Sequence, residues 1–409
     1  MNILLINHYA GSLRHGMEYR PFYLAREWVR LGHRVRIVAS AQSHIRAQAP
    51  HLDGRARLSE TIDGVEYLWI ATPAYRGNGA ARVINMFAFV SQLFRQARQL
   101  VDDFSPDVVI ASSTYPLDIW PAHRIARMAG ARLLFELHDL WPLSPMELGG
   151  YSKWHPFIML LQAAENFACR HADAIVSILP KVRDHLEQHG MAPHKLHIVP
   201  NGADPAEWLA IAPAVPGLAG ARLAALRRQG KFIVGYAGTH GIANALDTFL
   251  AAARLVGDEQ IAFVLVGGGP AKESLQRMAH DMKLANVHFF DPVPKEQVPA
   301  LLHSFDVAYI GWQRQRLYRF GIAPNKLIDY MMAGCTILHS VDAGNDPVAE
   351  AGCGLTVAPQ DPQAVSRGLL ALFMLDPQER AALGERGRTY ALSNLSYPVL
   401  GKRFLQACA

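Results

Sequence analysis

Short apolar runs that end in a polar loop and lead into an amphipathic segment recur along this chain. The first run, ILLIN at residues 3–7, is followed by the loop HYAGSLRHGMEYRP, the amphipathic run FYLAREWVRLGH and a second apolar run, RVRIVAS. The same order returns at KFIVGYAG and again at IAFVLVGGG. Strands that alternate with helices form parallel sheets covered by those helices. We therefore expect an α/β protein built from doubly wound parallel sheets.

The length of 409 residues is too great for one ordinary core and predicts two such domains. Half of the residues are hydrophobic and 18% are charged, which is typical of a globular chain and excludes disorder. We expect a first domain at 1–204, a linker rich in Ala, Pro and Leu at 205–230, and a second domain at 231–390.

The N-terminal segment and the spacing of the cysteines indicate the cellular location. The opening MNILLINHYAGS has no basic region and only a short apolar run, so it indicates a buried strand and not a signal peptide. No stretch approaches the roughly 20 apolar residues of a spanning helix. The four cysteines show no CxxC spacing, which suits reduced thiols. We expect a cytoplasmic protein.

The excess positive charge lies mainly in the first half of the chain. The net charge is +5, and residues 1–200 hold 21 Lys and Arg against 17 Asp and Glu. This bias is too diffuse to indicate nucleic-acid binding. It is compatible with binding to the anionic inner face of a membrane or to a phosphate-bearing acceptor.

The segment GIAPNKLIDYMMAG at 321–334 predicts a short helix with charged groups near its start. Pro324 and Asn325 can form the first turn, and Gly334 can end the helix. Lys326 near the N-terminus and Asp329 one turn later suit a nucleoside diphosphate, because the ammonium favours phosphates and the carboxylate can accept from two ribose hydroxyls. The alternative is an ordinary capped helix with a surface ion pair.

Glycines precede a predicted helix in the second half. Gly235, Gly238 and Gly241 have GxxGxxG spacing at the end of the run KFIVGYAGTHG. We expect free backbone N–H groups there to face a ligand, although the motif is weak alone.

In the first half, His138 and Asp139 follow the predicted strand in RLLFELHDLWP. Open α/β sheets bind ligands at the carboxyl ends of their strands, so this pair is a candidate for substrate binding or catalysis. The alternative is a structural hydrogen bond.

The loop after residue 7 offers further candidates. Gly11 and Gly16 would let backbone approach a ligand, and His15, Glu18 and Arg20 could reach into a cleft. A flexible surface loop is the alternative for each side chain.

The run AARVINMFAFVSQLFRQARQL at 80–100 is apolar and carries Arg82, Arg95 and Arg98 near its ends. Such a helix can lie in a membrane interface. It can equally be a core-packing helix whose arginines reach solvent.

His185 and His189 have the i, i+4 spacing of metal ligands. We interpret them as part of a solvated helix end, because Arg183, Glu187 and Gln188 surround them and His189 complements the helix dipole. No metal site is expected.

The helix at 321–334 and its continuation, TILHSVDAGNDPVAEAGCGLTVAPQDPQAV, resemble the donor-binding end of the retaining glycosyltransferases of family 4 and, within them, the bacterial surface-polysaccharide branch. The resemblance implies the GT-B fold, with two Rossmann-like domains facing a cleft. It implies transfer of a hexose or N-acetylhexosamine type of sugar from a nucleotide sugar, expected to be UDP-linked, to a lipid-linked or glycan acceptor. No metal or other cofactor is implied.

The resemblance also assigns roles to residues. It places 11–20 beside the cleft, His138 and Asp139 at the reacting sugar, Lys326 at the leaving phosphate, and 391–409 in a helix that crosses back to the first domain. The implied donor-binding residues are Gly238, Thr239, His240, Gly268, Val293, Arg319, Asn325, Lys326, Leu327 and Asp329.

Two departures from the family pattern leave other functions open. Thr239 and His240 stand in the loop where many members carry arginine and then lysine, so Lys326 with Arg314, Arg316 or Arg319 must supply the positive charge. Members also carry a glutamate eight residues before the position of Asp329, where this chain has glycine. A sugar-nucleotide epimerase of the same fold and a catalytically silent nucleotide-sugar-binding protein remain alternatives.

Overall fold

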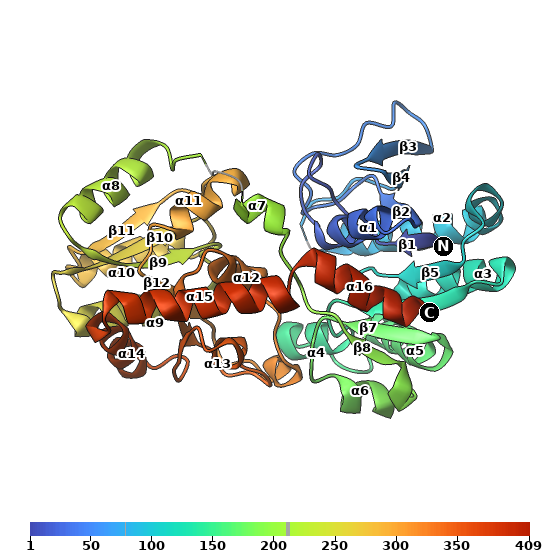
Figure 1. The fold of residues 1–409 in the computed structure, drawn as a ribbon. Helices are drawn as coiled ribbons and strands as arrows, with labels where there is room; N and C mark the ends of the chain where they lie inside the picture. The colour runs from blue at the N-terminus through green and yellow to red at the C-terminus, as the bar shows by residue number, and fades with distance from the viewer. Residues whose placement is uncertain (78, 210–212) are drawn as a thin grey trace. The chain divides into compact units, whose positions relative to one another are not determined.

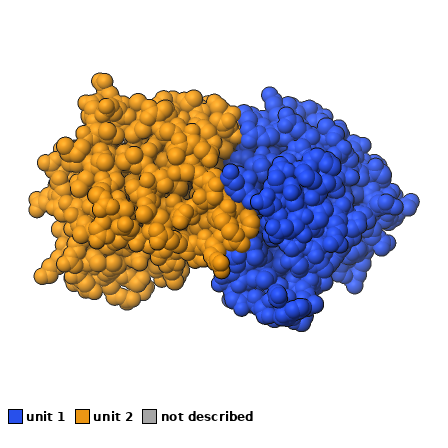
Figure 2. Space-filling model, turned by 90° about the horizontal axis from the view of Figure 1, so that it is seen from below, with its two compact units in different colours: residues 1–201, 397–409 blue, residues 202–396 orange. Residues whose placement is uncertain are grey.

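The computed structural model describes residues 1–77, 79–209 and 213–409. Contacts divide the chain into unit 1, residues 1–201 and 397–409, and unit 2, residues 202–396, which are coloured separately in Figure 2. Each unit has its own sheet and core, as two domains of this length require.

The described part of unit 1 is an eight-stranded sheet in the order β3-β4-β2-β1-β5-β6-β7-β8. Neighbours are parallel except the β3–β4 hairpin at one edge. The strands are β1 (Asn2–Ile6), β2 (Arg34–Ser40), β3 (Arg57–Ile62), β4 (Val65–Ile70), β5 (Val108–Ala111), β6 (Arg132–Leu137), β7 (Ala174–Ser177) and β8 (Leu196–Ile198). The helices are α1 (Arg20–Arg30), α2 (Ala80–Phe104), α3 (Ile119–Ala129), α4 (Leu143–Gly149), α5 (Pro156–His171), α6 (Arg183–Gln188) and α16 (Tyr397–Cys408).

The C-terminal helix α16 belongs to unit 1, where it lies against α1 (Figure 1). The indole N–H of Trp28 donates to the carbonyl of Gly401 over 3.1 Å. A side chain at Gly401 would come within 2.9 Å of Glu27 Cβ, so glycine lets the two helices approach closely. The chain enters unit 1 at Tyr397, six residues after the expected start of the crossing, because residues 391–394 still form the end of a unit 2 helix.

The described part of unit 2 is a six-stranded, fully parallel sheet in the order β11-β10-β9-β12-β13-β14. The strands are β9 (Phe232–Ala237), β10 (Ile261–Val266), β11 (Val287–Phe290), β12 (Val307–Gly311), β13 (Thr336–Ser340) and β14 (Gly354–Thr356). The helices are α7 (Pro205–Leu209), α8 (Gly217–Arg228), α9 (Leu246–Val256), α10 (Lys272–Asp281), α11 (Val298–Leu302), α12 (Asn325–Met332), α13 (Pro347–Ala351), α14 (Pro362–Met374) and α15 (Pro377–Asn394).

The central strands of unit 2, β9, β10, β12 and β13, are buried on both faces, which explains their continuous apolar runs. Ile233 of β9 packs in one apolar cluster, while its neighbours Phe232 and Val234 pack in a second. Successive side chains of a strand point to opposite faces, so the helices must cover both sides of the sheet. The doubly wound α/β fold expected from the sequence is confirmed.

The expected linker at 205–230 is wrong. The division by contacts falls between Asn201 and Gly202, and α8 places Leu223 and Leu226 in the core of unit 2. Arg227 on the same helix pairs with Asp306 at 2.8 Å. The Ala- and Leu-rich composition therefore reflects a packed helix. Part of the predicted linker, residues 210–212, lies outside the described residues.

Among the helices that the structure describes, none combines the length and apolar character needed to cross a membrane.

Candidate functional site

Helix α12 places Lys326 beside the glycine loop after β9, and Asp329 follows one turn later on the same helix. Leu327, Ile328 and Met331 are buried in the core of unit 2, so the helix is fixed along its inner face. The Lys326 Nζ atom donates to the Tyr236 hydroxyl at 2.6 Å and to Asn244 Oδ1 at 3.3 Å. It also lies 4.0 Å from the centre of the Tyr236 ring. The ammonium is therefore held against the loop and is not extended into solvent.

Burial changes the pKa of both charged groups on α12. It lowers the pKa of Lys326 to about 7, although the Asp329 carboxylate acts in the opposite direction. It raises the pKa of Asp329 to about 7, although Lys295 and Lys326 act to lower it. Both ionised forms have lost hydration. Each side chain therefore gains from a ligand that offers it charge or hydrogen bonds.

Two glycine loops meet next to Lys326. Gly238 follows β9 with φ of 144°, and a Cβ atom there would lie 2.6 Å from Lys326 Cε. Gly267 follows β10 with φ of 151°, and its Cβ would lie 1.9 Å from the Gly238 carbonyl oxygen. L-residues rarely adopt such φ values. Glycine is thus required at both positions for the loops to approach each other and the lysine.

The expectation of a free N–H group is wrong for Gly238. The Gly238 N–H donates to the Val266 carbonyl at 2.9 Å, and the His240 N–H donates to the Gly268 carbonyl at 2.8 Å. Gly235 lies inside β9, where a Cβ would meet the Phe305 ring at 2.2 Å. The following helix, α9, begins only after a short 3₁₀ turn at Ile242–Asn244. Gly238 therefore serves loop-to-loop packing, and Gly235 lets β9 pack against Phe305.

His240 is fully buried in this loop. Neither ring nitrogen has a hydrogen-bond partner among the described residues. Burial and the nearby Lys272 and Lys326 lower the pKa of His240 to about 4. The imidazole is thus neutral at pH 7 and contributes no positive charge to the loop.

The remaining predicted donor-binding residues divide by exposure. Thr239, Arg319 and Asn325 are exposed, while Gly268 and Val293 are partly exposed. Arg319 stacks on the Phe320 ring at 4.3 Å. Arg314 and Arg316 are exposed as well.

Leu327 differs from the other predicted donor-binding residues. Its side chain is buried in the core, and its N–H donates to the Pro324 carbonyl at 3.1 Å. The structure gives it a packing role.

In unit 1, polar side chains follow the carboxyl ends of β1, β5 and β6, which are adjacent in the sheet. The Asn7 amide donates to Ser112 Oγ at 3.1 Å, and Ser112 Oγ donates to Glu136 Oε2 at 2.6 Å. His138 Nε2 lies 3.0 Å from Ser112 Oγ and 3.3 Å from Glu136 Oε2. β1 and β5 are parallel neighbours, and the order of strands in the sheet reverses between them, with β2 to β4 on one side and β5 to β8 on the other. Doubly wound sheets bind ligands at such a point. His138 therefore has a fixed ring orientation at such a point.

The expectation that Arg20 reaches into a cleft is wrong. Its side chain is 1% exposed and donates from Nε to Glu136 Oε1 at 2.9 Å. It also donates to the carbonyls of Val199 and Pro200 at 2.8 and 2.6 Å. Burial by itself would raise the pKa of Glu136, but the charges of His138 and Arg20 bring it down to about 2. Arg20 thus compensates the buried carboxylate that orients His138.

Asp139 forms hydrogen bonds within its own loop. Its carboxylate accepts from the Leu140 N–H at 2.9 Å, from Ser144 Oγ at 2.6 Å and from the Trp141 indole at 3.2 Å. These contacts match the structural alternative for this residue. Of the predicted pair, His138 has the more favourable geometry for contact with a substrate.

The loop before α1 is closed by its own contacts. A Cβ at Gly11 would lie 1.9 Å from the Gly16 carbonyl oxygen, and one at Gly16 would lie 2.9 Å from Ala47 Cβ. His15 is 7% exposed and pairs with Glu60 at 3.2 Å, so it is neither flexible nor on the surface. Glu18 is half-buried. The glycines permit close approach of protein to protein here.

Helix α2 packs in the core of unit 1, as one of the two alternatives for residues 80–100 states, and its other face carries exposed apolar residues. Phe89 and Leu93 are buried in the core of unit 1, whereas Ile84, Phe87 and Phe94 are 61%, 43% and 37% exposed. The exposed residues have the spacing of one helical face. The helix therefore packs with one side and presents an apolar stripe with the other.

The interpretation of His185 and His189 as a solvated helix end is wrong. They are 11% and 24% exposed, and both face the buried carboxylate of Glu165 on α5. The sequence around the two histidines is polar because its other residues face solvent. Glu165 lies 20 residues before His185, and nothing in the sequence indicates that the two are in contact.

Several residues of the site escaped the sequence analysis. Tyr236 and Asn244 bind Lys326, and neither belongs to a recognised motif. Glu136 had a signal, because it is the one charged residue inside the apolar part of RLLFEL. A carboxylate in a buried strand needs compensating groups and so indicates a polar network.

Comparison with known protein families gives a match for each half of the chain. Residues 15–202 match the glycosyl transferase 4-like domain, and residues 231–374 match the glycosyl transferases group 1 domain. The first match falls within unit 1 except for its last residue, and the second falls within unit 2.

Whole proteins are similar as well. The chain is 24% identical over 282 residues to the putative colanic acid biosynthesis glycosyl transferase WcaI of Escherichia coli (strain K12), covering 66% of this chain and 67% of that one. It is 25% identical over 330 residues to the probable glycosyltransferase WbjE of Pseudomonas aeruginosa, covering 80% and 78%. The solved structure of Anabaena HepE in complex with UDP and glucose has a TM-score of 0.65 and 14% identity, covering 99% of this chain and 98% of HepE.

Proposed function

We propose a specific reaction for this chain, which belongs to the glycosyltransferases of the GT-B fold. It moves a sugar of the hexose or N-acetylhexosamine type from a UDP-sugar to a lipid-linked or glycan acceptor, with retention at the anomeric carbon. The product is a cell-surface polysaccharide or its precursor.

The observation that carries this proposal is the pair of charged side chains on α12. Lys326 is held against the glycine loops after β9 and β10, and Asp329 follows one turn later. An ammonium beside a glycine loop suits a diphosphate, and a carboxylate one turn away suits the two hydroxyls of a ribose. Both groups are partly desolvated, so both gain from those partners.

The relatives support the substrate classes. WcaI is described as a colanic acid biosynthesis enzyme, and HepE is described in complex with UDP and glucose. Resemblance to retaining family 4 enzymes at 321–334 supports the stereochemical outcome.

In this reaction, Lys326 stabilises the charge that develops on the leaving phosphate. The ammonium supplies this stabilisation directly, so the proposed mechanism routes no step through a metal. His138 positions the sugar or the acceptor hydroxyl from unit 1. If the Nε2–H donates to Glu136, the lone pair of Nδ1 can accept a hydrogen bond from a substrate hydroxyl.

Incubation of the purified protein with single UDP-sugars tests the reaction. Transfer that requires a lipid-linked saccharide or free glycan acceptor, with product of unchanged anomeric configuration by NMR, is the expected result. Isomerisation of the UDP-sugar without acceptor would identify an epimerase. Binding of UDP-sugars without turnover, across a panel of acceptors, would identify a catalytically silent nucleotide-sugar-binding protein. Thr239 and His240, which replace the arginine and lysine of many family members, are the reason for this alternative. Either result overturns the proposal.

The control is Lys326→Ala in the same assay. Turnover should fall strongly while the circular dichroism spectrum stays that of the wild type. Equal turnover would mean that α12 is not the donor site.

A further inference from the structure

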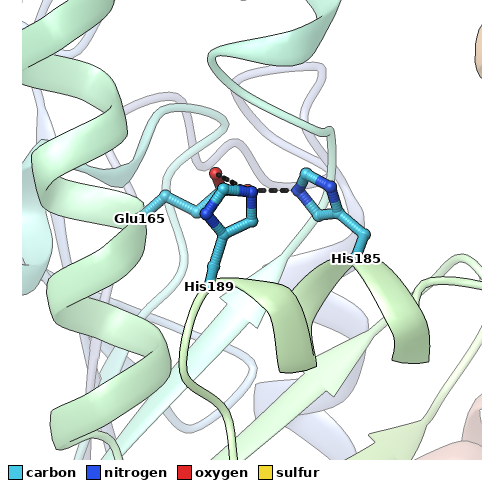
Figure 3. Close-up of side chains that lie close together, drawn as sticks. All are labelled: Glu165, His185 and His189. Carbon is cyan, nitrogen blue, oxygen red and sulfur yellow. Dashed lines mark hydrogen bonds and ion pairs between the residues drawn. The ribbon is translucent and has the colours of Figure 1, made fainter.

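Two histidines and a glutamate converge in unit 1 on residues that the β1, β5 and β6 strand ends do not contribute. His185 and His189 come from α6 and its C-terminus, and Glu165 comes from α5 (Figure 3). One ligand atom of each residue lies within 4.8 Å of those of the other two. Figure 3 shows both imidazoles turned toward the carboxylate. Glu165 is 1% exposed, and its carboxylate is therefore held away from water.

The surrounding amides fix the tautomer of His189. Gln162 Nε2 donates one proton to Glu165 Oε2 at 2.7 Å and the other to Asn166 Oδ1 at 2.9 Å. His189 Nδ1 lies 2.8 Å from Asn166 Oδ1, an acceptor. Because both Gln162 protons are used, the 3.1 Å approach of Gln162 to Nδ1 carries no hydrogen bond, and Nδ1 keeps its own proton for Asn166.

With Nδ1 protonated, the lone pair of His189 lies on Nε2, on the side of Glu165. Metal-binding histidines commonly donate their second ring N–H to an oxygen in this way, which orients the ring and raises its basicity. An ion pair between Glu165 and the histidines does not by itself require Gln162 and Asn166 to orient the His189 ring in this way.

We infer that Glu165, His185 and His189 form a Zn²⁺ site that links α5 and α6. The site is separate from the proposed transfer reaction and does not depend on it.

The distances fit a tetrahedral ion after small movements. Zn–N and Zn–O bonds of about 2.0–2.2 Å at tetrahedral angles place ligand atoms about 3.3–3.6 Å apart. His185 Nε2 lies 2.9 Å from Glu165 Oε1, and His189 Nε2 lies 4.0 Å from Glu165 Oε2. The two distances are to different oxygens of the carboxylate, so a small rotation of Glu165 or of one imidazole must bring both nitrogens to about 3.3–3.6 Å from the same oxygen. A water molecule can take the fourth position, because His189 is partly exposed.

The ligand set favours zinc over the hard cations. Ca²⁺ and Mg²⁺ prefer six or more oxygen ligands, and this group offers one carboxylate and two imidazoles. Two histidines and one glutamate form a known set for Zn²⁺.

Isothermal titration of the chelator-treated full chain with ZnCl₂ tests the site. We expect one Zn²⁺ per chain, a higher unfolding temperature with zinc, and no such response to MgCl₂ or CaCl₂. Substitution of Zn²⁺ by Co²⁺ should give the strong visible absorption of a four-coordinate ion.

The variants His185→Ala and His189→Ala should lose this binding. Asn166→Ala, which keeps all three ligands, should weaken it by about 10- to 100-fold. His194→Ala is the matched control, because His194 is exposed in the adjacent turn, and it should bind as the wild type does.

Absence of zinc binding by the folded wild type overturns the site. So does wild-type affinity in both His185→Ala and His189→Ala, since the metal would then bind elsewhere, for example at a thiol. Circular dichroism of each variant verifies that lost binding is not lost folding, and Asn166→Ala still tests the site if an alanine at a ligand position unfolds the protein.

Discussion

The Lys326 ammonium donates to the Tyr236 hydroxyl at 2.6 Å, and that hydroxyl donates onward to the Thr239 carbonyl at 2.7 Å. Asn244 completes the arrangement, because its amide accepts from Lys326 at 3.3 Å and donates to Thr239 at 3.0 Å. The first turn of α12 and the loop after β9 are thereby joined through one side chain. The conformation of this loop is therefore held by hydrogen bonds to Lys326.

We predict that Lys326→Ala weakens UDP binding by about tenfold to a hundredfold, since a charge-assisted hydrogen bond contributes about 1.5 to 3 kcal/mol. Isothermal titration with UDP measures the effect. Lys231→Ala is the control, because Lys231 is a lysine of unit 2 whose ammonium lies outside this loop and donates to the Glu259 carbonyl at 2.6 Å. Unchanged UDP affinity in a folded Lys326→Ala protein contradicts the assignment.

The second prediction concerns pH. Burial places the pKa of Lys326 near 7 in the free protein, so the ammonium is lost as pH rises above 7. A bound diphosphate stabilises the charged form, and binding then takes up a proton. UDP-sugar affinity should fall as pH rises through 7, by at most about tenfold per pH unit.

Lys326→Arg is the matched variant for this test, because guanidinium stays charged throughout the range. Its affinity should be nearly independent of pH between 8 and 9, where Asp329, with its pKa near 7, is already ionised. If the wild type shows the same flat profile, the titrating lysine does not contact the donor.

The pH dependence of folding stability that Lys326 contributes has the opposite sign to that of a lysine in a stabilising ion pair. The pKa of Lys326 is lower in the folded chain than its ordinary value of 10.5, so its charged form costs folding free energy. That cost is fully present below pH 7 and disappears as pH rises from 7 to 10.5. The desolvated ammonium thus lowers the stability of the free protein, and a bound donor offsets this loss by pairing with the charge.

The third prediction is that Asp329→Asn weakens binding of UDP more than binding of 2′,3′-dideoxy-UDP. Asparagine keeps the shape of the side chain but loses the charge and part of the acceptor capacity for two hydroxyls. Titration of both nucleotides into both proteins gives the coupling directly. Asp342→Asn, at an exposed position, is the control. Equal losses for the two nucleotides would separate Asp329 from the ribose.

The fold was predictable because its signals are local. Apolar runs such as IAFVLV, followed by glycines and an amphipathic helix, appear within one stretch of chain and specify a strand, a loop and a helix. The start of α12 at Asn325 and its end near Gly334 were predictable for the same reason. The linker was misplaced because Ala and Leu are equally common in linkers and helices, and only packing distinguishes Leu223 in a core.

The site was only partly predictable because its contacts join distant segments. Lys326 was identified from its place at a helix start, but its partner Tyr236 lies 90 residues away. Arg20 and Glu136 lie 116 residues apart, so nothing in the sequence shows that each satisfies the other. Compensation of buried charge is a tertiary property, and a sequence shows only the charge that needs it.

That buried pair leads to the fourth prediction. Arg20→Ala should lower the free energy of unfolding by about 3–5 kcal/mol, because it leaves the Glu136 carboxylate buried without its partner. Urea denaturation measures the change. Arg183→Ala, which breaks the exposed pair with Glu187, should cost no more than about 1 kcal/mol. Equal losses of unfolding free energy in Arg20→Ala and Arg183→Ala would show that Arg20 does not compensate a buried charge on Glu136.

The last prediction is that unit 1 binds membranes through the exposed face of α2, because the proposed acceptor is lipid-linked. Ile84, Phe87 and Phe94 form an apolar stripe, and Arg95 is exposed beside it, so apolar insertion and attraction to anionic lipid can act together. The test variant changes Phe87 and Phe94 to Ser and leaves the buried Phe89 in place, so that the core is kept.

Vesicle sedimentation should show wild-type binding that rises with the fraction of anionic lipid and falls with salt. Each basic residue near such a surface contributes about 1 kcal/mol. The double variant should bind weakly, whereas Leu218→Ser, which removes an exposed apolar residue from unit 2, should bind as the wild type does. If the wild type ignores anionic vesicles and uses a water-soluble acceptor as well as a lipid-linked one, the exposed face of α2 has another role, because a lipid substrate would bring the enzyme to the bilayer surface.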